Sequence, residues 1–121
     1  MIRRALVVIG LLFSLALSTA HAGQWAYLAY EQFTLTSTAR GFTASLISPS
    51  GRQQATNASC DLLTADATYT IDGTAVTPTN GNYWTAGTSK VIVGHDALVN
   101  FSTVLATSTT GASFRCTYSA P

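Results

Sequence analysis

The sequence predicts an all-β fold: a single antiparallel β-sandwich of Greek-key or jelly-roll type, with about eight short strands and one disulfide. Thr and Ser make up 28 of residues 23–121, and β-branched Thr fits a pleated sheet better than a helix. No apolar stripe with a helical period runs longer than about two turns. Alternating residues instead recur between turns about 8 to 12 residues apart, a spacing typical of a sandwich or barrel.

The first 22 residues have the three parts of a secretory signal peptide. A basic start with Arg3 and Arg4 precedes an apolar run over 5–17 and a small-residue ending at Ala22. As a helix, that run is about 20 Å long, shorter than the roughly 30 Å hydrocarbon core. We therefore expect cleavage after Ala22, a mature domain over 23–121 with no membrane span, and a secreted or periplasmic location. The alternative is a retained N-terminal anchor.

The only two cysteines, Cys60 and Cys116, are expected to form a disulfide, because an exported chain folds under oxidising conditions. Closing a loop of about 57 residues should stabilise the fold by roughly 4 kcal/mol. A zinc site is excluded by ligand number, since only His95 could join the two thiolates and zinc needs three or four ligands. We expect no cofactor.

The first half of the mature chain contains three strand candidates and a hairpin. Residues 24–36 form the first strand, with Trp25 and Tyr27 on one face and Tyr30 on the other. A second strand over 42–48 ends at a turn containing Pro49 and Gly51. The remaining elements are a short strand over 60–63 and a hairpin that pairs 68–71 with 74–77 through a type I′ turn at Asp72-Gly73.

The second half supplies four more strand candidates. These cover 83–86, 90–93, 98–106 and 112–118. In the last of them Phe114, Cys116 and Tyr118 share one face, which places the cysteine inward. Gly94-His95-Asp96 is interpreted as a polar turn between two strands.

Charge argues against a nucleic-acid partner. The formal net charge is +1 with 6 Lys+Arg and 5 Asp+Glu, and removing the two leader arginines leaves 4 basic against 5 acidic residues. Arg40, Arg52, Lys90 and Arg115 are scattered singly, whereas phosphate binding needs a basic stripe.

Catalytic parts are scarce, so we do not expect an enzyme. His95 is the only histidine of residues 23–121. Its neighbour Asp96 would point to the other side of an extended chain, and no G-x-S-x-G sequence is present. The carboxylates are isolated in sequence, which gives no reason to expect the close pair that glycoside hydrolysis needs.

Aromatic residues supply the leading functional hypothesis. Tyr83 and Trp84 directly follow Gly81-Asn82, so two rings lie beside a loop that also carries Asn80. Aromatic rings can stack on sugars, and side-chain amides can bind sugar hydroxyls. The combination indicates a non-catalytic binding module for a glycan or protein at the cell surface or envelope. The alternative is that Trp84 fills the core.

A second aromatic cluster, Trp25, Tyr27 and Tyr30, puts apolar residues on both faces of the first strand, which an exposed edge strand avoids. This strand is either buried centrally or docks into another copy by strand addition. One rival function is therefore a structural subunit of a surface filament or adhesin that assembles through this strand. A second is a small secreted inhibitor of a hydrolase, for which a rigid, disulfide-tied domain that presents one loop would suffice.

Overall fold

The computed structural model describes residues 25–107 and 110–121, so the expected leader over 1–22 lies outside the described residues. It confirms an all-β fold with two antiparallel sheets, ordered β1-β7-β2-β5 and β4-β3-β6. The described chain has seven strands rather than about eight: β1 Ala26–Leu35, β2 Asn57–Leu63, β3 Ala67–Thr70, β4 Asn82–Trp84, β5 Ser89–Val93, β6 Ser102–Leu105 and β7 Ala112–Ala120. Two short helices complete it, α2 Ala44–Ile47 and α3 His95–Val99.

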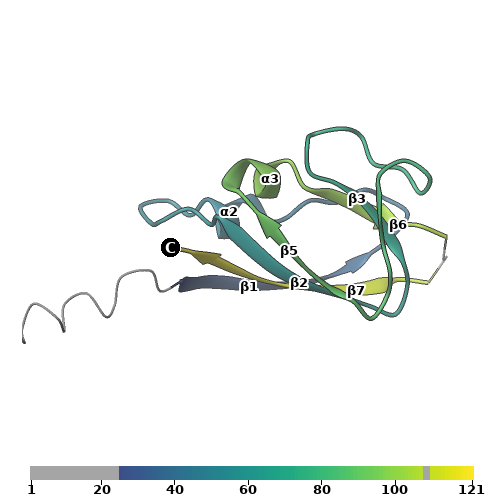
Figure 1. Ribbon diagram of the computed structural model, residues 1–121, viewed down its shortest axis with the longest axis horizontal. Coiled ribbons are helices and arrows are strands. Elements are labelled where there is room, and N and C mark those ends of the chain that lie inside the picture. The colour runs from purple at the N-terminus through teal and green to yellow at the C-terminus, as the bar shows by residue number, and fades with distance from the viewer. Residues whose placement is uncertain (1–24, 108–109) are drawn as a thin grey trace, which may run out of the picture.

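The four-stranded sheet forms one layer of the molecule (Figure 1). Above its inner face lie β3 and β6 at one end and the two helices at the other. The first and last strands of the chain, β1 and β7, pair along their lengths. Within residues 25–107 and 110–121, no helix has the length and apolar character needed to cross a bilayer.

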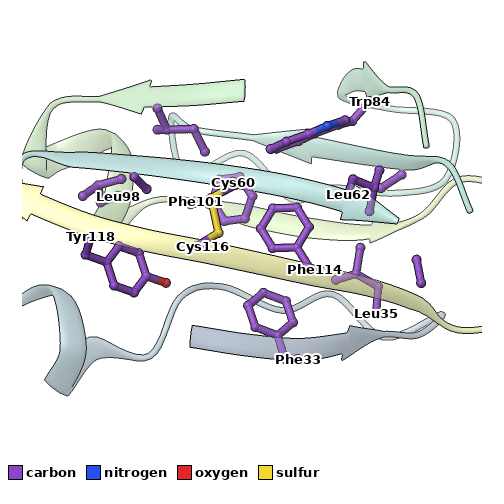
Figure 2. Close-up of a cluster of buried hydrophobic side chains, with 14 of the residues drawn as sticks. Phe33, Leu35, Cys60, Leu62, Trp84, Leu98, Phe101, Phe114, Cys116 and Tyr118 are labelled. Atoms are coloured by element: carbon purple, nitrogen blue, oxygen red, sulfur yellow. A yellow bond between two sulfur atoms is a disulfide. The ribbon is translucent and has the colours of Figure 1, made fainter. Parts of the chain in front are cut away.

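Strict alternation along β7 builds the core. Phe114, Cys116 and Tyr118 point inward and are at most 1% exposed, as the sequence predicts. Cys60 lies directly opposite Cys116 on β2, and the expected disulfide joins them. Figure 2 shows the disulfide among the aromatic rings, with Phe114 5.0 Å from Trp84 between ring centroids.

A β-bulge in β1 corrects the predicted faces of the first strand. The register shifts between Tyr27 and Ala29, so that Tyr27 lies opposite Ser119 and Tyr30 opposite Thr117. Both β7 partners point to the outer face of the sheet, so the two tyrosines share that face instead of opposing each other. Beyond the bulge the alternation directs Glu31, Phe33 and Leu35 into the core.

The predicted strand over 42–48 is wrong, because these residues contain the short helix α2. The main-chain N–H and the hydroxyl of Thr43 both donate to the buried carboxylate of Glu31. This anchor holds the chain at the start of α2, and the helix then buries Ile47. A contact with a residue 12 positions earlier has overridden the local alternation.

The predicted hairpin is also absent, and β3 pairs with β4 and β6 instead. Thr64 is the only non-glycine residue of the described chain with positive φ, so Asp72 lacks the conformation that a type I′ turn requires. Residues 71–81 fold over the outer face of β3, where the Thr68 hydroxyl donates to the Thr77 carbonyl at 2.6 Å. Val76 is buried by this arrangement.

The third correction concerns the chain after β5. The expected turn at residues 94–96 and the start of the strand expected over 98–106 form α3, and only Ser102–Leu105 is strand. Gly94 has φ +104, a conformation open to glycine, and this turns the chain out of β5 into the helix. The helix buries Leu98 against the end of the four-stranded sheet.

Candidate functional site

A polar pocket lies where β3 ends and β4 begins. Its volume is about 310 Å³, and its walls come from the end of β3, the loop that follows and the residues that lead into β4. The lining residues are Thr70, Ile71, Asp72, Thr74, Asn80, Gly81 and Asn82. Two of the four predicted ligand-binding residues, Asn80 and Asn82, are therefore brought together here.

Hydrogen bonds fix the first wall of the pocket. The Asp72 carboxylate accepts the Thr74 N–H at 3.0 Å, and the buried Thr70 hydroxyl donates to the Thr74 carbonyl at 2.7 Å. The backbone N–H of Thr74, followed by its side chain, holds the pKa of the Asp72 carboxyl below its usual value. The pocket therefore presents an ionised carboxylate at neutral pH.

The second wall is a tight turn that only glycine can complete. The Asn80 N–H lies 3.0 Å from the hydroxyl and 3.2 Å from the carbonyl of Thr77. Gly81 has φ +139, and a Cβ at this position would approach the Tyr69 carbonyl oxygen to 3.0 Å. The side chain of Asn82 is exposed and has no hydrogen bond to another described residue, so its carboxamide can bind a ligand.

The other two predicted residues do not line the pocket. Trp84 is fully buried, its indole N–H donates to the Thr88 carbonyl at 3.2 Å, and its ring packs against Phe114. The core alternative for Trp84 is therefore the one observed, and its ring does not form a stacking surface for a sugar. Tyr83 is 55% exposed, but alternation along β4 points it away from Asn82.

Tyr83 is instead part of a separate surface contact. Its hydroxyl donates to the carboxylate of Asp66, which also accepts the Ala86 N–H at 2.7 Å. The Ala86 N–H, followed by the Tyr83 hydroxyl, lowers the pKa of Asp66, and the bond to Asp66 raises the pKa of Tyr83. This contact ties β4 to the residues just before β3.

A serine and a histidine also meet, between the two helices. His95 Nδ1 donates to the Ala55 carbonyl oxygen at 2.8 Å, and its Nε2 lies 3.4 Å from the Ser48 hydroxyl. In a catalytic triad, histidine Nδ1 donates to the carboxylate of an aspartate or glutamate, whereas here it donates to the Ala55 carbonyl. Neither residue lines the pocket described above, and their contact joins the end of α2 to the start of α3.

A buried carboxylate was missed by the sequence analysis. Glu31 accepts a hydrogen bond from the Tyr118 hydroxyl at 2.5 Å, from both donors of Thr43, and from the Arg40 guanidinium at 3.3 Å. Burial, and then the bond to Glu31, raise the pKa of Tyr118. Nothing in the local sequence marks Glu31 as an inward residue, because its partners come from two separate segments, the stretch of Arg40 and Thr43 and strand β7.

Within the described residues no three His, Cys, Asp or Glu side chains gather as a metal site would require. The residues of the first wall were also missed as ligand candidates, although the Asp72-Gly73 turn that carries them was a visible sequence feature. No known protein-family model, curated protein or solved structure matches the chain. What the pocket binds is therefore inferred from its own side chains.

Proposed function

We propose that the protein is a non-catalytic glycan-binding module and that the pocket of Asn80, Asn82 and Asp72 receives a sugar ring. The observation that carries the proposal is the convergence of amide, hydroxyl and carboxylate groups on one hollow. Its volume of about 310 Å³ is at the small end of ligand sites, which span about 300–1,000 Å³. It suits one ring, or the end of a chain, better than an extended oligosaccharide.

The chemistry of the lining matches a sugar. Ring hydroxyls both donate and accept hydrogen bonds, and each carboxamide offers a donor and an acceptor. The Asp72 carboxylate adds a charged acceptor, whose hydrogen bonds are stronger than neutral ones. Ile71 is 41% exposed at the same pocket and can cover the apolar C–H face of a ring.

The test is binding to a glycan array, followed by calorimetry with the best oligosaccharide. We expect Asn82→Ala and Asn80→Ala each to weaken binding by about tenfold or more, because each loses a hydrogen bond to a ligand that stays polar. Gln54→Ala removes an exposed amide that does not line the pocket and should bind normally. Equal binding by all three variants, or no glycan bound by the unaltered protein, would refute the proposal.

We also propose that the protein works outside the cytoplasm, secreted or periplasmic. The disulfide between Cys60 and Cys116 supports this, since such bonds persist in oxidising compartments. Cell fractionation with thiol labelling tests the location. Recovery in the cytoplasm with both thiols reduced would contradict it.

A further inference from the structure

The outer face of the four-stranded sheet carries an unusual share of the exposed apolar surface. Of the eight large apolar side chains exposed in the described residues, five belong to its two edge strands and their flanks. Tyr27 and Tyr30 lie on β1, Val91 and Val93 on β5, and alternation places Trp25 on the face of Tyr27. No described helix or strand covers this face (Figure 1).

The strand registers arrange these side chains in rows across the sheet, in the order β1, β7, β2, β5. The first two rows carry no charged residue and combine an aromatic edge, a hydroxyl or amide centre and a valine edge. They are Tyr27-Ser119-Asn57-Val93 and Tyr30-Thr117-Ser59-Val91. We call these eight residues the outer patch.

The next row holds the charges. It reads Gln32-Arg115-Asp61-Ser89, with Arg115 on β7 and Asp61 on β2. These opposite charges are neighbours, yet the one ion pair in the described part of the chain joins Glu31 to Arg40. The Nε atom of Arg115 is buried without a hydrogen-bond partner.

We propose that this face binds the same face of a second copy. The two copies are related by a two-fold axis that lies between the facing sheets, runs parallel to the strands and passes midway between β7 and β2. Such an axis exchanges β1 with β5 and β7 with β2, while each row stays at its own level. Tyr30 then faces the partner's Val91, and Tyr27 faces the partner's Val93. Arg115 faces the partner's Asp61, and the reciprocal pair forms by symmetry.

This charge complementarity selects a second copy as the occupant. One arrangement covers the aromatic edge of each copy with the valine edge of the other and supplies Arg115 with a carboxylate. Aligned sheets pack within about 30° of each other, so the central charged pairs stay opposed despite the twist. A carbohydrate could stack on the tyrosines, but its binding would not require the charged row or the valines.

The available area suits a weak dimer. The four strands have 10, 9, 7 and 5 residues, and at about 4.8 Å between strands and about 3.3 Å per residue they give a face of about 500 Å² per copy. Two such faces bury about 1,000 Å², which is in the range of weak, transient interfaces. The dimer differs from assembly by strand addition, because β1 is paired with β7 of its own chain.

Sedimentation velocity of the mature protein, from about 5 to about 500 μM, should show a concentration-dependent dimer. Asp61→Arg places arginine against the partner's Arg115, and Arg115→Asp places aspartate against the partner's Asp61. Each variant alone should dimerise at least about tenfold more weakly, because like charges oppose across the interface. An equimolar mixture of the two should restore dimerisation as a heterodimer, since every charged contact is then between opposite signs.

The mixing experiment separates contacts between copies from effects within one chain. A change of fold or stability in a single variant cannot be repaired by adding the other variant. Val91→Lys tests the apolar edge and should weaken the dimer, whereas Val99→Lys, at an equally exposed valine on α3, should not. A monomer throughout the concentration range, or single variants that dimerise as tightly as their mixture, would overturn the proposal.

Discussion

Tyr118→Phe isolates a buried polar contact of the fold. Tyr118 is fully buried on β7, and its hydroxyl donates to Glu31 at 2.5 Å. Phenylalanine keeps the ring and its packing against Phe42, 5.3 Å away between centroids. The substitution therefore removes one hydrogen bond to a charged group and almost no packing.

The expected loss of stability is about 2 kcal/mol. A hydrogen bond to a charged group contributes about 1.5–3 kcal/mol, more than a neutral one. Glu31 keeps its bonds to Arg40 and Thr43, so it is not left uncompensated. In a domain of about 100 residues, this loss corresponds to a fall in Tm of about 10 °C.

Urea unfolding followed by circular dichroism measures the difference, and the m-value should stay unchanged. Tyr30→Phe is the matched control, because its hydroxyl donates to Gln32 at 3.1 Å on the exposed outer face. Its loss should stay below about 0.5 kcal/mol. Equal losses for the two variants would refute the view that Tyr118 stabilises a buried carboxylate.

The same contact predicts how stability depends on alkaline pH. Burial, and then the bond to Glu31, raise the pKa of Tyr118 above its ordinary value near 10. The folded state thus keeps a proton that the unfolded chain loses, so this contribution is complete below about pH 10 and falls by about 1.4 kcal/mol per pH unit above it. The stability gap between the unaltered protein and Tyr118→Phe should narrow between about pH 10 and about pH 11.5. A constant gap would contradict this.

Three further outcomes are expected. Replacing Cys60 and Cys116 together by alanine should lower the free energy of unfolding by roughly 4 kcal/mol in a urea titration, and an unchanged midpoint would show that the disulfide adds nothing. Gly81→Ala should cost about 1–3 kcal/mol by calorimetry, because of the positive φ and the approach to the Tyr69 carbonyl; a neutral result would mean that the turn can relax. In an NMR titration the Asp72 carboxyl should titrate below its usual value near 3.9, and a normal midpoint would argue against its bond to Thr74.

Two-residue alternation made the sheet framework predictable. It correctly placed Phe114, Cys116 and Tyr118 inward, and the export argument correctly paired Cys116 with Cys60. What alternation alone cannot show is an inserted residue. The bulge at Leu28 shifts every earlier side chain of β1 to the other face, which is why Tyr27 was predicted to lie on the face opposite Tyr30.

Two of the errors in secondary structure share one cause, which is that side-chain hydroxyls form hydrogen bonds outside the regular ladder of a strand. Residues 42–48 alternate like a strand, but Thr43 binds Glu31 and a helix follows. Residues 74–77 alternate as well, but the Thr77 and Thr74 carbonyls accept hydrogen bonds from the hydroxyls of Thr68 and Thr70 and do not pair in a strand. Such contacts are set by the assembled fold and leave no local periodicity.

Two of the four residues predicted for the candidate site, Asn80 and Asn82, line the pocket. Asn80 and Asn82 flank a glycine turn, so their exposure could be inferred from the sequence. Whether Trp84 faced the pocket or the core depended on the register of β4 against β3, where Trp84 pairs with Ala67. That register comes from the hydrophobic core and not from the loop that precedes the strand.

The disulfide links two neighbouring strands of one sheet and does not bridge the two layers. Its covalent constraint therefore secures the alignment of β2 with β7, whereas the smaller sheet is attached by side-chain packing, loops and a few main-chain hydrogen bonds such as those between Thr103 and Arg40. Partial opening of the oxidised protein should release β3, β4 and β6 first, with the tethered pair exchanging its amide hydrogens last. The opening of the pocket near β4 and the lasting integrity of the larger sheet would then be governed by different parts of one small domain.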